Sequence, residues 1–240
     1  MVSNSASGAQ PVLAVTGLAK EARLASGDDV VAIGAGGNPE RLRRMLADRL
    51  SPECRAVVSI GIAGGLDPDL EPGDVLIASA IVTAEARYPA DPAIVAAWER
   101  ALAGIGVSVR TADLAGVDAA VLSVAAKASL RTATACAAVD MESHVAAAFA
   151  QAHGLPFAAL RIVCDPAGRA IPAFAATALK PNGEPDVLAV LGAVARQPGQ
   201  VGALIRLARD SGRAFQSLKH CRTRLGTALG VPDGPRLVPQ

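Results

Sequence analysis

Residues 138–144 read AVDMESH, and residues 160–165 read LRIVCD. The first stretch leads from a short apolar run into a helix predicted over 141–153, and the second ends an apolar strand predicted over 155–163. One carboxylate, Glu142, then lies at the start of a helix, and another, Asp165, lies just past a buried strand. Two carboxylates fixed at such element ends can divide labour, one binding hydroxyl groups and the other transferring a proton.

Strands and helices alternate along the chain before these two stretches as well. Asn38 is typical of a helix cap and Pro39 of a first helical residue. The continuous apolar run over 55–60 is typical of a strand buried on both faces of a parallel sheet, and the glycine-dense segment 61–68 is predicted to be a loop. The other predicted strands cover residues 11–16, 30–33, 75–82, 107–111 and 135–139, and the other predicted helices cover 20–25, 41–50, 92–103 and 124–132.

This alternation predicts an α/β fold in which helices cover both faces of a central mixed sheet. We expect one domain over residues 11–172, preceded by a flexible tail over residues 1–10. Residues 173–240 are predicted to form a helical C-terminal extension that packs on the same domain.

Composition excludes several classes of protein. Only 2% of the 240 residues are aromatic and the net charge is +1, which argues against a nucleic-acid-binding surface. The cysteines are scattered and His144 and His153 are interpreted as packing or helix-end residues, so no metal site is expected. No signal peptide or membrane-crossing run is visible, and a cytoplasmic protein with reduced thiols is predicted.

The C-terminal region 199–229 has a helical pattern with an apolar stripe and a basic side. A helix of this kind can lie on an anionic membrane surface, so the inner membrane surface is one expected location. The alternative is a helix whose apolar stripe packs on the domain while its basic side faces water. Its basic residues are Arg206, Arg209, Arg213, Lys219, Arg222 and Arg224, against the single acid Asp210.

Four motifs in order along residues 11–172 resemble the nucleoside phosphorylase superfamily, in the branch with methylthioadenosine/S-adenosylhomocysteine nucleosidases. GIAGGL at 61–66 with PGD at 72–74 is similar to the glycine segment and following strand start of that family, and EARY at 85–88 to its next segment. VDME at 139–142 resembles the ribose-binding motif, usually VEME, and VCD at 163–165 resembles the catalytic strand end, usually ISD.

Three longer segments and the arginine-rich end resemble the hopanoid-associated phosphorylases within this superfamily. The segments are VTGLAKEA at 15–22, DMESHVA at 140–146 and HGLPFAALR at 153–161. This resemblance implies release of adenine from adenosylhopane, a lipid-linked adenine nucleoside of bacterial hopanoid synthesis. It also implies a homo-oligomer, since family members are usually dimers or larger, and no cofactor other than inorganic phosphate as a co-substrate.

The resemblance assigns roles to three residues of the AVDMESH and LRIVCD stretches. Asp165 would protonate the purine N7, Glu142 would bind the ribose 2′- and 3′-hydroxyls, and Met141 would lie against the sugar. From position alone, Asp165 could equally be a turn cap, Glu142 a solvated acid in a first helical turn, and Met141 core filler. Phosphate or another nucleophile would be held near Gly17, Glu21, Gly61, Gly64 and Arg87, with Arg23 and Arg161 as further charge partners.

Departures from the family pattern leave the nucleophile open. The hydrolases usually carry three acids in the first helix, the third of which activates water, whereas this chain has only Glu21, one position early. Ile62 replaces the usual serine of the glycine segment, and the purine-stacking phenylalanine is replaced near residues 118–121. Two alternatives therefore remain beside phosphorolysis of adenosylhopane: hydrolysis of methylthioadenosine or another soluble adenine nucleoside, and nucleoside binding without catalysis.

Overall fold

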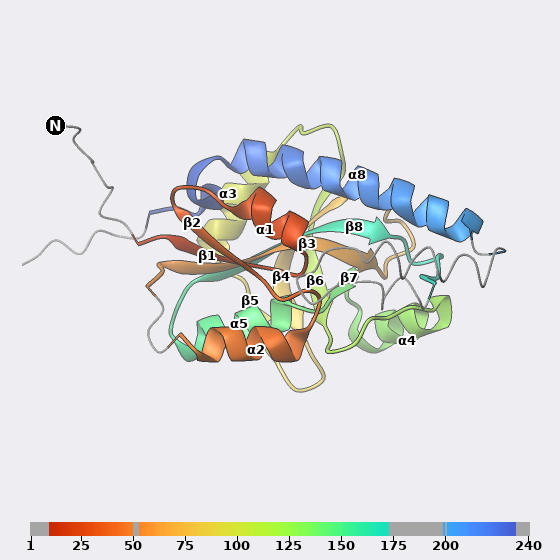
Figure 1. The fold of residues 1–240 in the computed structure, drawn as a ribbon, viewed down its shortest axis with the longest axis horizontal. Coiled ribbons are helices and arrows are strands. Elements are labelled where there is room, and N and C mark those ends of the chain that lie inside the picture. Colours follow the sequence, from red (N-terminus) through yellow and green to blue (C-terminus); the bar gives the residue numbers. More distant parts are fainter. Residues whose placement is uncertain (1–9, 50–52, 173–198, 200, 234–240) are drawn as a thin grey trace, which may run out of the picture.

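The described part of the chain forms an eight-stranded mixed sheet with helices on both sides (Figure 1). The computed structural model describes residues 10–49, 53–172, 199 and 201–233. The predicted tail, apart from Gln10, and the parts 173–198, 200 and 234–240 of the predicted extension lie outside the described residues. The predicted α/β architecture, with one central sheet and a C-terminal helix, is confirmed.

The elements follow the predicted alternation. Asn38 caps its helix as expected, because its side chain accepts a hydrogen bond from the Arg41 N–H at 2.8 Å. The strands are β1 (Val12–Thr16), β2 (Val30–Gly34), β3 (Ala56–Gly65), β4 (Val75–Val82), β5 (Arg87–Pro89), β6 (Val109–Gly116), β7 (Ala138–Asp140) and β8 (Phe157–Asp165). The helices are α1 (Ala19–Ala25), α2 (Pro39–Ala47), α3 (Pro92–Leu102), α4 (Val124–Thr134), α5 (Ser143–Ala152), α8 (Val201–Leu225) and the 3-10 helix η2 (Thr227–Gly230).

Strand pairing closes part of the sheet into a ring. The order is β2-β1-β3-β7-β6-β4-β5, and β8 pairs in parallel with β3 and antiparallel with β4. Strands β3, β7, β6, β4 and β8 therefore form a closed circuit of pairings. At one end of this circuit Gly64 of β3 pairs with Val139 of β7 and with Asp165 of β8. The stretches 138–144 and 160–165 thus meet on either side of Gly64.

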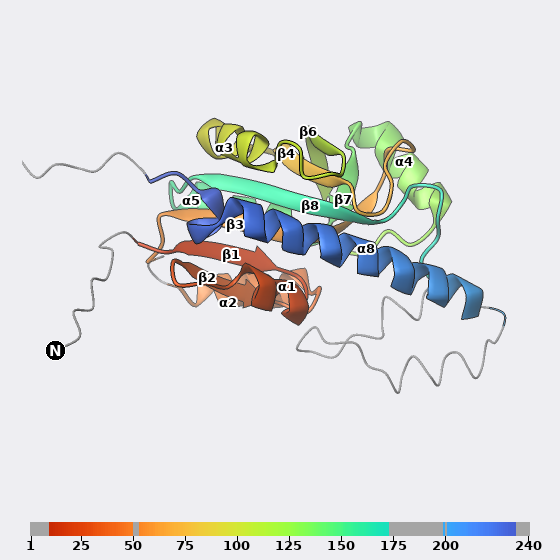
Figure 2. The same ribbon diagram turned by 90° about the horizontal axis from the view of Figure 1, so that it is seen from above.

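Helices cover both faces of the sheet, as Figures 1 and 2 show. Helices α1, α3 and α8 lie on one face, where they surround a core that includes Trp98 and Leu218. Helices α2 and α5 lie on the other face over a second core that includes Leu42 and Val145. All nine residues of β8 are buried, which explains why its sequence is apolar without the alternation of a half-exposed strand.

The predicted glycine loop over 61–68 is wrong in its first half, because β3 continues to Gly65. The glycines do not break the strand here; they make room for neighbouring side chains. A Cβ atom on Gly61 would lie 2.6 Å from Oε1 of Glu21 and 2.9 Å from Nη1 of Arg161. The pattern alone did not indicate this close approach, since a glycine run is more often a turn. Strand β5 was not predicted, and β6 extends five residues beyond the predicted end at Thr111.

Helix α8 packs along β8 and against α3 and α1. Its buried residues include Ala214, Leu218 and Leu225, whereas Val201 and Ile205 in its first turns are exposed. Two of the six basic residues predicted to face outward make internal contacts: Arg222 donates to the Ser26 and Gly226 carbonyls and Arg224 to those of Ala101 and Ala103. Among the described residues, no helix combines the length and hydropathy needed to cross a membrane.

Candidate active site

A cavity of about 330 Å³ lies at the end of the ring where β3, β7 and β8 meet. Its walls come from the start of α1, the ends of β3 and β8, the junction of β7 with α5, and α8. Glu142 and Asp165 both line it, together with Met141. Its remaining surface is largely apolar and includes Val121, Leu122, Ile171 and Leu207.

The junction of β7 with α5 is fixed by Asp140. Its Oδ1 accepts hydrogen bonds from the backbone N–H groups of Glu142 at 2.8 Å and Ser143 at 2.7 Å. Asp140, the last residue of β7, therefore caps the start of α5. This leaves the neighbouring Glu142 side chain without a capping role, and only 7% of Glu142 is exposed. The interpretation of Glu142 as a solvated acid is therefore wrong.

Arg161 is the cation of this end of the cavity, and it is completely buried. Its Nη2 donates to the Ser59 and Ser143 hydroxyls at 2.7 and 3.0 Å and to Asp140 Oδ1 at 3.0 Å. The same nitrogen lies 3.7 Å from Oε2 of Glu142. Its Nε and Nη1 have no hydrogen-bond partner among the described residues.

One guanidinium faces three buried carboxylates, and this imbalance governs their protonation. Burial raises the pKa of Glu142 to about 8 against the opposing charge of Arg161, with Asp140 and Glu21 adding to the rise. Burial also raises the pKa of Glu21. Burial alone would raise the pKa of Asp140 too, but the charge and hydrogen bond of Arg161 outweigh it and lower that pKa. Asp140 is thus the ionised partner of Arg161, and Glu142 retains a proton near neutral pH.

Glu21 is held by backbone N–H groups from two elements. Its Oε2 accepts from Gly17 at 2.9 Å and Leu18 at 2.7 Å, and its Oε1 accepts from Ile62 at 2.8 Å. These donors surround the point where β1 turns into α1 and approaches β3. Backbone N–H groups clustered at a strand-to-helix turn are typical of an anion site. Here the anion position is taken by a side chain of the protein itself.

Asp165 ends β8 at the other end of the cavity and pairs with Lys127. Nζ of Lys127 lies 2.5 Å from Oδ2 of Asp165, and both side chains are buried. Burial raises the pKa of Asp165, and the charge of Lys127 opposes that rise. The cavity therefore has a carboxyl group with a raised pKa at each end, each next to a different buried cation.

Comparison with known proteins identifies the family of this chain. The family model of the Phosphorylase superfamily matches residues 7–197. The chain belongs to this superfamily. No curated protein is significantly similar to it in sequence.

Solved structures of nucleosidases and hydrolases share this superfamily fold. The 5′-methylthioadenosine/S-adenosylhomocysteine nucleosidase of Helicobacter pylori is 15% identical, with a TM-score of 0.65 over 91% of this chain and 97% of that chain. The S-adenosylhomocysteine nucleosidase of Streptococcus pyogenes is 17% identical, with a TM-score of 0.63 over 90% and 97%. Futalosine hydrolase of H. pylori is also 17% identical, with a TM-score of 0.58 over 65% and 88%. At these identities the likeness establishes the fold alone.

Most site residues suggested by the superfamily resemblance lie together. Gly17, Glu21, Gly64, Met141, Glu142 and Asp165 all line the cavity. Gly61 lies just behind it, in contact range of Glu21. Arg87 does not line this cavity; it is exposed and forms an ion pair with Asp113. Arg87 therefore forms a surface ion pair and is not part of the cavity wall.

Sequence reasoning missed Lys127 as a site residue and named Arg161 only as one of several charge partners. Arg161 interrupts the apolar run of β8, which was the one local signal that it is buried and paired. Lys127 gives no such signal, because a lysine in a helix of small and polar residues is usually solvated. The segment near residues 118–121, where the purine-stacking phenylalanine was missing, does reach the cavity through Ala120 and Val121.

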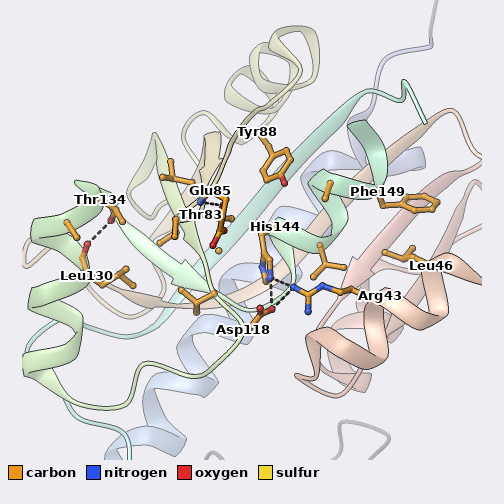
Figure 3. Close-up of a pocket in the computed structure, with 18 of the residues that line it drawn as sticks. Arg43, Leu46, Thr83, Glu85, Tyr88, Asp118, Leu130, Thr134, His144 and Phe149 are labelled. Carbon is orange, nitrogen blue, oxygen red and sulfur yellow. Dashed lines mark hydrogen bonds and ion pairs between the residues drawn. The ribbon is translucent and has the colours of Figure 1, made fainter. Parts of the chain in front are cut away.

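A larger cavity of about 960 Å³ lies on the other side of the α5 start (Figure 3). His144 and Arg43 meet at Asp118 there, with His144 Nε2 and Arg43 Nη2 at 3.0 and 2.6 Å from its Oδ1. The acids of this cavity, Asp118 and Glu85, are exposed, and Asp118 has a pKa lowered by His144 and Arg43. Because its acids are exposed, whereas Glu142 and Asp165 of the smaller cavity are buried, the smaller cavity is the candidate active site. Within the described residues, no cluster of acids, histidines and cysteines could bind a metal ion.

Proposed function

We propose that the protein cleaves the N-ribosyl bond of an adenine nucleoside. The observation that carries this proposal is the pair of buried acids with raised pKa values, Glu142 and Asp165, at the two ends of one cavity. Breaking the C–N bond builds positive charge on the sugar, and the base leaves poorly unless it is protonated. An acid that keeps its proton near neutral pH can supply that proton, an effect of about 10²–10⁴-fold.

Each acid then has one task. Asp165 would donate its proton to the purine N7, and burial, which raises its pKa, favours the protonated form. Glu142 would accept hydrogen bonds from the ribose 2′- and 3′-hydroxyls, with Met141 against the sugar. Those hydrogen bonds favour the ionised carboxylate, so Glu142 would lose its proton when the ribose binds. The purine would rest on aliphatic side chains such as Val121 and Leu122 in place of an aromatic ring.

We propose that the nucleoside carries a lipid, with adenosylhopane as the substrate that the resemblance implies. The apolar residues Ile171 and Leu207 line the cavity, and Leu207 belongs to α8. Val201 and Ile205 are exposed on the same helix, next to the exposed Arg206, Arg209 and Arg213. An apolar wall that continues onto a basic helix surface suits a substrate drawn from an anionic bilayer. The protein would then act in the cytoplasm at the inner membrane surface, as a homo-oligomer like its family.

Vesicle co-sedimentation tests the membrane part of the proposal. A variant with Arg206, Arg209 and Arg213 changed to Gln should lose binding to anionic vesicles at low salt, and wild-type binding should fall as salt rises. The matched control changes three exposed arginines away from α8, namely Arg44, Arg100 and Arg110, and should bind like the wild type. If the wild type does not bind at low salt, or if both triple variants lose binding equally, α8 has no special role at a membrane.

Inorganic phosphate is the nucleophile that the hopanoid-associated resemblance favours. Gly17 and Gly61 lie around Glu21, and Nε and Nη1 of the nearby Arg161 have no partner among the described residues. An ionised Glu21 would repel phosphate. Burial raises the pKa of Glu21 and so favours its protonated form, and only that form can share the site with an anion.

Hydrolysis is the second candidate, and a specific observation favours it. The Glu21 carboxylate already accepts the N–H groups of Gly17, Leu18 and Ile62, which are the donors that a phosphate would need. A carboxylate held in this way at the sugar end of the cavity can instead accept a proton from an attacking water.

One experiment separates these candidates and the non-catalytic alternative. Adenosylhopane and methylthioadenosine are each incubated with the protein, with and without phosphate, and adenine and the sugar products are identified by mass spectrometry. Phosphorolysis requires phosphate and gives a sugar phosphate, whereas hydrolysis proceeds without it and gives a free sugar. Binding of either nucleoside without release of adenine would refute N-ribosyl cleavage and leave a nucleoside-binding protein.

A further inference from the structure

Lys127 is the only residue of α4 that is buried, and it has no exposed surface. Its Nζ lies 2.5 Å from Oδ2 of Asp165 and within 3.2 Å of the Asp165 carbonyl. The same nitrogen lies 3.0 and 3.1 Å from the carbonyl oxygens of Pro166 and Arg169. One ammonium group therefore binds both the side chain and the following turn of the proposed proton donor.

These contacts exceed what anchoring a helix requires. Burying an ammonium group is costly unless it is paired and hydrogen-bonded, and a leucine or methionine at this position would anchor α4 at lower cost. All four acceptors belong to the short segment from Asp165 to Arg169. The lysine is thus specific to the end of β8, where the cavity lies.

The contact also divides the two oxygens of the Asp165 carboxyl group. Oδ2 is bound by Lys127, whereas no other described residue donates a hydrogen bond to Oδ1, and the side chain lines the cavity. A carboxyl group held through one oxygen presents the other in a fixed direction. The proton needed at the purine must leave from the oxygen that faces the purine.

We infer that Lys127 is a positioning residue for Asp165, which holds Oδ2, leaves Oδ1 to the purine and sets the pH range over which Asp165 can donate. The inference rests on the proposed function, since it assigns Lys127 to the same proton transfer.

No other cation contacts Asp165 within the described residues. Arg169 on the following turn also lowers the pKa of Asp165, but less than Lys127 does, and its guanidinium is paired with Asp210 of α8. Cys164, the neighbour on β8, has a pKa raised to about 11 by burial and stays neutral. At the opposite end of the cavity, the charge of Arg161 opposes the rise in the pKa values of Glu21 and Glu142. Lys127 is therefore the charged group whose removal should move the titration of Asp165 most.

The direction of that movement follows from the two opposing effects. Burial raises the pKa of Asp165 and Lys127 counteracts it, so without Lys127 the pKa rises further. A proton donor works below its pKa, so the decline of kcat/KM at high pH should move to higher pH. The shift should be about 1–3 pH units, the usual effect of one close opposite charge. At the same time kcat should fall by about tenfold or more at the pH optimum, because the carboxyl group is no longer oriented.

The experiment compares pH profiles of Lys127→Met, Lys127→Gln and Lys127→Arg with the wild type. Met and Gln remove the charge and should both move the alkaline limb upward, whereas Arg keeps the charge and should leave the limb in place while lowering kcat. Arg110→Met removes an exposed cation of β6, outside the cavity and α8, and serves as the matched control. A limb that stays in place in folded Met or Gln variants would overturn the inference and reduce Lys127 to a structural anchor. If neither neutral variant folds, Lys127→Arg decides alone, and an unchanged kcat would contradict the positioning role.

A second measurement separates this inference from the proposed function. The ¹³C signal of the Asp165 carboxyl group, assigned with Asp165→Asn, is titrated without substrate in the wild type and in Lys127→Gln. A rise of the Asp165 pKa in the variant supports the coupling even if no nucleoside is cleaved. Equal titration curves would refute the coupling even if adenine is released.

Discussion

The two ends of the active-site cavity bury carboxyl groups beside a cation, but in different proportions. At the proposed sugar end, Arg161 faces Asp140, Glu142 and Glu21, whereas at the proposed base end Lys127 faces Asp165 alone. The first arrangement carries excess negative charge if every acid ionises, so protons must remain on it near neutral pH. The second is balanced in charge, and only burial keeps the Asp165 pKa raised. Charge ratio as well as depth therefore decides which end can exchange a proton with a ligand.

Removing the cation from each end should give the largest effect. Arg161→Met leaves three buried acids without a cation and should lower the free energy of unfolding by about 3–5 kcal/mol near neutral pH. The loss should shrink toward pH 5, because protonation of the acids removes the repulsion that Arg161 normally offsets. Lys127→Met should cost less, since a single Asp165 can neutralise itself by taking up a proton. Urea unfolding at both pH values measures this, with the exposed Arg110→Met as the control. Equal losses for the two variants would contradict the importance of the charge ratio.

Loss of the acid at the base end should abolish most activity. Asp165→Asn preserves the shape of the side chain but has no carboxyl proton, so adenine release should fall by about 10²-fold or more, or about 3 kcal/mol of barrier. Asp118→Asn in the larger cavity is the matched control and should stay within about threefold of the wild type. Comparable losses of activity in the two variants would show that the reaction does not depend specifically on Asp165.

Loss of the acid at the sugar end should depend on the sugar. Glu142→Gln should slow cleavage of the ribonucleoside by about 10-fold or more beyond its effect on a 2′,3′-dideoxy analogue, since hydrogen bonds to a charged group contribute about 1.5–3 kcal/mol. Steady-state assays with both substrates measure the difference. The same loss on both would show that Glu142 does not bind the hydroxyls.

The smallest expected effect is a proton released when ribose binds. Glu142, with a pKa of about 8, is mainly protonated at pH 7 in the free protein. Hydroxyl donors favour the ionised form and lower that pKa, so the ribonucleoside should release a fraction of a proton more than its dideoxy analogue, up to about one. Calorimetry in two buffers of different ionisation enthalpy detects this in an Asp165→Asn background, where cleavage does not interfere. The extra release should vanish when Glu142→Gln is added, and its persistence would assign the proton to another group.

Local patterns predicted the elements but not how far each one extends. The continuous apolar runs at β3 and β8 were assigned correctly to buried strands, because burial on both faces leaves no polar alternation. The glycines at the end of β3 misled, since a glycine required by a neighbouring side chain and a glycine required by a turn look alike in sequence. Helix α5 begins at Ser143 and not at Met141, because Asp140 caps it from the strand before.

The sequence by itself determined the α/β class, the order of the elements and the two acids at their ends, since periodicity and motif order are local properties. Only the tertiary structure decided which charges meet. The register of the strands places Gly64, Val139 and Asp165 side by side. Within the closed ring of paired strands, Arg161 of β8 lies near Asp140 and Glu142. Helix α4 places Lys127 next to Asp165 at the end of β8. Arg87, by contrast, was drawn into an exposed ion pair with Asp113. Electrostatic partners are chosen by distance and burial in space, and neither can be read from spacing along a chain.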